Sequence, residues 1–229
     1  MATYTAYEDL LPELIAMTPG CSDTMIRNAI RSAAIEFCEG TGVYQSQLDP
    51  ISTVKGEYEY DFEAPANTRV HKILWVNYQG TNLEPISTSL LEERLPSWRT
   101  TIGSTPEYYV KNTSTTLSLV PVPANTVANS TTIRVQLKPT HDSTQCDADI
   151  MSDYRDAIVH GALFRLLRMP SKDWTDYTAA SVYGNLFTQG METAKLRARH
   201  QDEGVARSVK YGGFAPRRTS YRNKYGSQK

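Results

Sequence analysis

The chain has 229 residues, 40% of them hydrophobic and 21% charged, a composition that supports a packed core and argues against wholesale disorder. The longest uninterrupted apolar runs, such as residues 73–76, are far shorter than the roughly 18 residues that a membrane-spanning helix needs. We therefore expect no membrane partner. The first residues lack the basic and apolar segments of a secretory signal peptide, so secretion is not expected, and the three widely spaced cysteines favour a reducing cytosol.

The formal net charge of −1 hides a strong asymmetry along the chain. Of the 24 Lys and Arg residues, seven lie within 204–229, a segment without Asp or Glu. The other 17 share residues 1–203 with all 25 acidic residues, which leaves that part with a net charge of −8. The basic segment follows neither a helical nor a strand period, so it should not form a core of its own.

We call residues 204–229 the C-terminal arm, and its reach is roughly 80–90 Å when straight. Its basic residues are interleaved with aromatic ones, a combination suited to anchoring on an acidic protein surface. A solvated terminus and nucleic-acid binding are the alternatives, although DNA would repel the acidic remainder of the chain. The candidate partner-binding residues are Arg207, Lys210, Tyr211, Phe214, Arg217, Arg218, Tyr221, Arg222, Lys224 and Tyr225.

Two helices are expected before residue 43. Residues 7–17 form a short helix with an acidic first turn. A second helix over 23–39, capped by Ser22 or Asp23, has apolar residues on one side at helical spacing. The Gly40-Thr41-Gly42 run ends it.

From residue 43 to 139 the apolar period changes to two, which predicts short antiparallel strands. A turn at 79–82 makes a hairpin whose second strand, marked by Pro85, is expected at a sheet edge. Residues 90–98 form a helical excursion, and 125–131 form a loop. The expected strands cover residues 57–62, 70–78, 83–86, 108–111, 116–120 and 132–137.

Helices return after residue 140. The helix over 154–169 is apolar on nearly every side, so it should be buried, with Gly161 and Ala162 permitting close approach of another helix. Ser171 or Asp173 caps a fourth helix that continues to residue 200. Its apolar stripe comprises Trp174, Tyr177, Ala180, Gly184, Phe187, Met191 and Ala194.

These patterns predict an α+β fold. A helical body of about four helices, residues 1–42 and 140–203, carries an inserted antiparallel β-sandwich or barrel-like lobe, residues 43–139. The C-terminal arm extends beyond it.

Motifs for catalysis and for metals are weak. The four histidines have no HExxH spacing, and no P-loop, GxSxG elbow or GxGxxG follows a strand. The widely spaced Cys21, Cys38 and Cys146 predict neither a disulfide framework nor a zinc site. We therefore expect no catalytic residues, no metal and no cofactor, and a protein that is not an enzyme.

Acidic residues gather just before the helix at 154–169. Asp147, Asp149, Asp153 and Asp156 lack the glycine and glutamate of a calcium-binding EF-hand loop. They more simply complement the positive end of a helix. His160 follows Asp156 by four residues and could be a carboxylate-oriented base, but structural packing is favoured because no nucleophile motif accompanies it.

Three stretches carry a resemblance to a known family. They are the helix over 23–39, the order of a Gly103-Ser104-Thr105-Pro106 turn, a Tyr108-Tyr109 strand and a hairpin ending in Pro121-Val122-Pro123, and the helix phrase over 156–163. In this order they resemble the head-to-tail adaptor (connector) proteins of tailed bacteriophages, over about residues 7–200. The arm shares no phrase with that family.

The resemblance implies a structural virion protein at the head–tail junction, assembled in the host cytoplasm. It would form a ring, a dodecamer, beneath the portal, with helical faces making ring contacts, tail or nozzle proteins below, and double-stranded DNA passing through the lumen without sequence-specific binding. It also implies a C-terminal extension that grips the portal. The helices over 23–39, 154–169 and 171–200 are the expected contact faces.

Two other hypotheses remain open. The fourteen tyrosines, several of them on predicted strands, could line a sugar-binding face, which would make the chain a carbohydrate-binding or tail-associated β module. The second alternative is a hydrolase of unrecognised type that uses Asp156 and His160.

Overall fold

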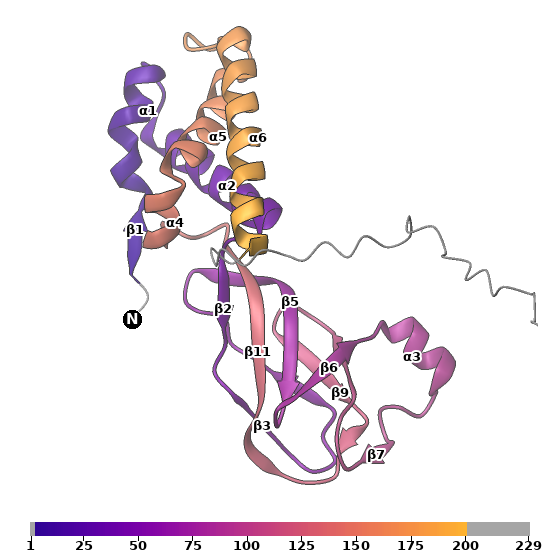
Figure 1. Cartoon of the computed structure of the whole chain (residues 1–229). Helices are drawn as coiled ribbons and strands as arrows, with labels where there is room; N and C mark the ends of the chain where they lie inside the picture. The colour runs from indigo at the N-terminus through magenta and orange to yellow at the C-terminus, as the bar shows by residue number, and fades with distance from the viewer. Residues whose placement is uncertain (1–2, 201–229) are drawn as a thin grey trace, which may run out of the picture.

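The computed structural model describes residues 3–200, with helices gathered at one end and a β lobe at the other (Figure 1). The predicted α+β class is confirmed, but the estimate of about four helices is not. The described residues contain six α-helices and one 3-10 helix, η1. Their bounds are η1 Tyr7–Leu10, α1 Leu11–Met17, α2 Asp23–Thr41, α3 Thr88–Arg94, α4 Ala148–Asp153, α5 Arg155–Leu167 and α6 Tyr177–His200.

The extra helices have local causes. The helix expected over 7–17 is divided into η1 and α1, and Pro12 stands in the first turn of α1, where its missing N–H costs nothing. A short helix, α4, precedes α5 because Asp147 caps it, accepting hydrogen bonds from the N–H of Asp149 at 3.1 Å and of Ile150 at 3.4 Å. The acidic cluster therefore serves a helix start, as the favoured interpretation held.

Helix α2 lies at the centre of the helical group. Ile30, Ala33 and Phe37 on its apolar side are fully buried, and Gly42 ends the helix with φ of 71°, a conformation that glycine adopts readily. Ser22 occupies the N-cap position, but its side chain makes no capping hydrogen bond. The Ser22 carbonyl instead accepts from the N–H of Ile26 at 3.1 Å.

Helix α5 crosses α2 and α6 at glycine. A Cβ atom added to Gly161 would lie 2.8 Å from the Phe187 ring and 3.0 Å from Ala33 Cβ. A Cβ on Gly190 of α6 would lie 2.7 Å from Ala157 Cβ. The predicted close approach at Gly161 is confirmed, and three helices meet there.

Helix α6 begins later than expected. Its cap is Asp176, whose carboxylate accepts from the N–H of Thr178 and of Ala179, each at 2.9 Å, rather than Ser171 or Asp173. Residues 170–176 fold back first, with Ser171 at φ of 59°. The predicted stripe was therefore wrong at its start: Trp174 precedes the helix and Tyr177 is exposed, whereas Ala180, Phe187 and Ala194 are buried.

The β lobe contains one eight-stranded sheet that curls into a half-barrel (Figure 1). Its order is β2-β11-β5-β6-β8-β9-β4, and β3 pairs with β11 beside β2. A sandwich of two sheets is not formed. The strands of this sheet are β2 Gln45–Gln47, β3 Ile51–Thr53, β4 Glu59–Asp61, β5 Thr68–Tyr78, β6 Thr81–Pro85, β8 Tyr108–Lys111, β9 Thr116–Val120 and β11 Val127–Pro139.

Four short strands lie outside this sheet. β1 Tyr4–Ala6 pairs antiparallel with β12 Gln145–Asp147 beside the helices. β7 Ile102–Gly103 pairs parallel with β10 Val122–Pro123. Neither pair was predicted, because three or fewer residues show no readable period.

Two predictions about the sheet were wrong. Residues 125–131 are not all loop, because β11 begins at Val127 and a register shift before Thr131 hides its alternation. Strand β6 is not an edge, since β5 and β8 both pair with it. In the parallel β6–β8 ladder the N–H groups of Glu84 and Ile86 donate, so Pro85 occupies a position that needs no donor.

A tight joint connects the helices to the sheet. The Gln136 amide of β11 donates to the carbonyls of Cys38 at 2.9 Å and Glu39 at 3.2 Å, at the C-terminal end of α2. Lys138 forms an ion pair with the Glu39 carboxylate. One hydrophobic cluster runs from Leu14 and Ile30 to Leu117 and Ile133, so both parts share a core.

Candidate interaction surfaces

Helix α6 has an exposed side without charge. No Asp, Glu, Lys or Arg occurs from residue 177 to 191, although about half of these residues are exposed. Val182 is 54% exposed and Leu186 37%. An exposed helix face normally carries charged side chains, so one that lacks them indicates a contact surface. We call its exposed residues, Tyr177, Thr178, Ser181, Val182, Asn185, Leu186, Thr188 and Gln189, the uncharged face of α6.

A groove of about 440 Å³ borders this face, between α6 and the start of α5. Leu186, Gln189 and Gly190 line it from α6, and Asp156 and His160 line it from α5. Its walls therefore combine a small apolar strip with carboxylate and imidazole groups, which suits a polypeptide segment better than a small apolar ligand.

The same groove tests the hydrolase hypothesis. Ser152 lines it together with Asp156 and His160, a proximity that sequence motifs did not reveal. Within residues 3–200, however, no hydrogen bond joins His160 to Asp156 or to Ser152, as a nucleophile and its base require. The His160 ring packs against Tyr183, with ring centroids 5.6 Å apart. The geometry supports the packing role.

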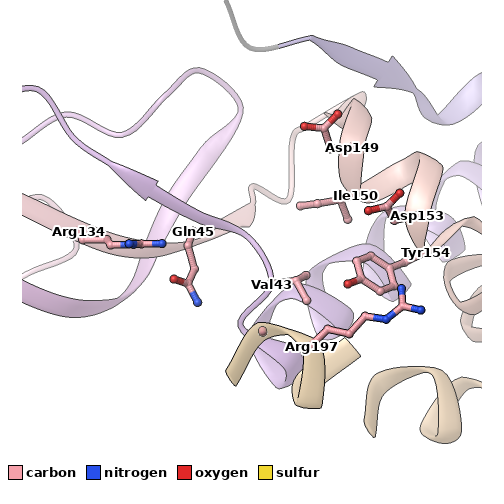
Figure 2. Close-up of a pocket in the computed structure, with 9 residues that line it drawn as sticks. Val43, Gln45, Arg134, Asp149, Ile150, Asp153, Tyr154 and Arg197 are labelled. Carbon is pink, nitrogen blue, oxygen red and sulfur yellow. The ribbon is translucent and has the colours of Figure 1, made fainter. Parts of the chain in front are cut away.

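A second pocket, of about 290 Å³, lies at the junction of the helices and the sheet (Figure 2). Figure 2 shows Asp149 and Asp153 on one side, Arg197 beside the Tyr154 ring, and Arg134 on the sheet. Two carboxylates and two guanidinium groups around an open pocket can pair with a charged polar segment. The C-terminal end of α6 forms one wall.

Buried ionisable groups serve structure. A hydrogen bond with Cys146, together with burial, raises the pKa of the Cys38 thiol, which holds it protonated and unreactive. Burial also raises the pKa of Tyr7, whose hydroxyl lies 3.1 Å from the Ser143 hydroxyl. All three cysteines are free thiols.

The strand tyrosines do not form a sugar-binding platform. Tyr60, Tyr78 and Tyr109 are buried in the core, and the half-buried Tyr58 packs edge-on against Trp98. Alternation placed these rings inward, as the core interpretation of the sequence expected.

The C-terminal arm lies beyond the part of the chain that the structure describes. All ten candidate partner-binding residues lie outside the described residues: Arg207, Lys210, Tyr211, Phe214, Arg217, Arg218, Tyr221, Arg222, Lys224 and Tyr225.

Within residues 3–200, no three His, Cys, Asp or Glu side chains converge to hold a metal ion. No helix of that part is long and apolar enough to cross a membrane.

Two open pockets and an exposed uncharged helix face are features typical of proteins that contact other polypeptides. A family model, SU10 adaptor protein, matches residues 5–210. The chain therefore belongs to that family of phage head–tail adaptors, and the resemblance in the sequence is confirmed. No curated protein matches the chain.

Proposed function

We propose that the chain is the adaptor subunit of a phage virion, forming a ring beneath the portal that joins the DNA-filled head to the tail. The observation that carries this proposal is the family match over residues 5–210, which covers nearly the whole chain. The ring is a dodecamer, tail or nozzle proteins bind below it, and double-stranded DNA passes through its lumen. The subunit is structural and catalyses no reaction.

The charge distribution supports passage of DNA without sequence-specific binding. Residues 1–203 carry a net charge of −8 by their Lys, Arg, Asp and Glu count. Like charge along a channel repels phosphates and keeps DNA mobile. A protein that grips DNA shows the opposite balance.

The C-terminal arm is the portal-binding element of the proposal. Its seven basic residues and its aromatic residues provide charged and stacking contacts to an acidic surface. Because exposed charges are screened within about 8–10 Å near physiological ionic strength, arm-mediated binding should weaken as salt is added.

The test compares the full-length chain with a truncation after Glu203, each mixed with portal rings and examined by electron microscopy and co-sedimentation. We expect the full-length chain to add a ring to the portal and the truncated chain to bind far more weakly, with an unchanged unfolding transition. A matched pair sharpens the test: Arg217→Ala with Arg218→Ala in the arm should weaken binding, whereas Lys55→Ala with Arg94→Ala, both exposed on the β lobe, should not.

Normal attachment of the truncated chain would refute the role of the arm. Absence of any ring on the portal with the full-length chain would refute the adaptor function itself.

A further inference from the structure

The helical group has a second exposed surface of low charge, on α1. Its exposed residues include Ile15, 42% exposed, and Met17, 46% exposed. Glu13 is the one charged residue among the exposed positions from 12 to 19, and its carboxylate pairs with Arg155 at 3.4 Å. We call the others, Pro12, Ile15, Ala16, Met17 and Pro19, the apolar tip of α1.

The apolar tip and the uncharged face of α6 lie on opposite flanks of the helical group (Figure 1). α1 packs against α2 and α5, and α6 packs against the same two helices from the other flank. Neither surface can cover the other within one chain.

The two helices also run in opposite directions. α1 follows η1, whose Tyr7 N–H donates to the Thr144 carbonyl at 3.1 Å beside the β1–β12 pair. It ends before Gly20, where an added Cβ would lie 4.0 Å from the Trp174 ring. α6 starts just after Trp174 and ends at the junction pocket, where Arg197 lines the wall. The apolar tip and the start of α6 are therefore at the same level.

Both flanks carry charged residues at the end nearest the β lobe, and the two sets have opposite sign. On the α1 flank this end carries the exposed carboxylates of Asp9 and of Glu8, of which Glu8 also pairs with Arg27 of the same chain at 3.6 Å. The sheet-proximal end of α6 carries the exposed guanidinium groups of Arg197 and Arg199. A copy placed flank to flank, by rotation about an axis parallel to the helices, sets the apolar tip of α1 against an uncharged face whose exposed apolar members are Tyr177, Val182 and Leu186, and sets acidic residues against basic ones.

We propose that the apolar tip of α1 packs on the uncharged face of α6 in a second copy of this chain, and that this pair is the contact repeated around the ring. The inference rests on the proposed ring, and it names the surfaces that build it. Two different faces that meet under rotation form a heterologous contact, the kind that closes into a cyclic ring.

Cysteine cross-linking tests this pairing in the full-length chain. In a Cys21→Ser background, Ala16→Cys and Val182→Cys place thiols on the two surfaces, and a short bismaleimide joins them while the protein is assembled on portal rings. The doubly substituted chain should give a ladder of covalent multimers on a denaturing gel. A mixture of the two singly substituted chains should stop at dimers.

The control pairs Ala16→Cys with Thr81→Cys, an exposed position at the β5–β6 turn, and should give no ladder. Dimers from Val182→Cys alone would overturn the proposal, because they require α6 to meet α6. Rings on the portal without a ladder would also overturn it while leaving the adaptor function standing. Failure to form rings at all would refute the adaptor function, and this inference would fall with it.

Discussion

Gly161 is the point at which the packing of the helical group can be tested most sharply. Gly161→Ala adds one methyl group where three helices meet. The added Cβ would lie 2.8 Å and 2.9 Å from two carbons of the Phe187 ring and 3.0 Å from Ala33 Cβ, closer than carbon atoms pack. Phe187 is only 3% exposed, so its ring has no room to withdraw without moving α6.

Two opposing contributions determine how much Gly161→Ala changes the free energy of unfolding. Overpacking of a filled core costs about 1–3 kcal/mol. Replacing glycine by alanine inside a helix returns up to about 1 kcal/mol of helix propensity. We therefore expect Gly161→Ala to lower the free energy of unfolding by about 1–2 kcal/mol, measured by urea denaturation monitored by circular dichroism.

Gly40→Ala in α2 is the matched control. It makes the same substitution inside a helix, but the new Cβ would lie 3.5 Å from the Met191 sulfur, an ordinary contact. This variant should be as stable as the parent or more stable by up to about 1 kcal/mol. Equal stabilisation by both substitutions would refute the tight crossing of α2, α5 and α6.

Two further predictions concern single side chains. Asp176→Ala removes the cap of α6 and should cost about 1 kcal/mol of unfolding free energy, whereas Asp173→Ala, which precedes the cap, should cost little; equal effects in denaturant titrations would place the cap elsewhere. Burial raises the folded-state pKa of Tyr7 above its unfolded value of about 10, so its contribution is fully present below pH 10 and is lost as pH rises through the folded pKa. Tyr7→Phe should lower the free energy of unfolding by about 0.5–1.5 kcal/mol at pH 8, because the hydrogen bond to Ser143 is lost. Above pH 10 the variant should lose less stability than the parent. The same decline in stability above pH 10 for both proteins would contradict this account, and Tyr177→Phe, at an exposed ring, is the control.

The long periodic elements could be predicted from the sequence because a single local rule decided each one. The apolar period of α2 and Gly42 after it predicted that helix, and the alternation over residues 132–137 predicted the second half of β11. The start of α6 could not be predicted from local pattern, because Ser171, Asp173 and Asp176 are all acceptable caps. The fold-back of residues 170–176, in which the Asp176 N–H bonds the Leu167 carbonyl at 3.1 Å, selects the third.

The pairing of strands could not be predicted from the local sequence pattern, for a different reason. β6 and β8 become parallel neighbours only because the excursion through α3 returns the chain to the sheet in the same direction. The small cluster of Leu91, Trp98, Val110 and Val120 holds that excursion in place, and it forms between residues far apart in sequence. A prediction from periodicity alone therefore assigns Pro85 to an edge that the tertiary structure covers.

The sequence carried a signal for the uncharged face of α6, but hydrophobic periodicity does not detect it. Apolar spacing identified Phe187 and Ala194 as the inward side of the helix, and it says nothing about the other side. The informative signal is the absence of charge over residues 177–191, in a chain that is 21% charged. Residues 177–191 of α6 therefore lack charge on the exposed side as well as on the buried side. The fold of one chain covers only the buried side, and the exposed side is the surface that we propose packs against another copy.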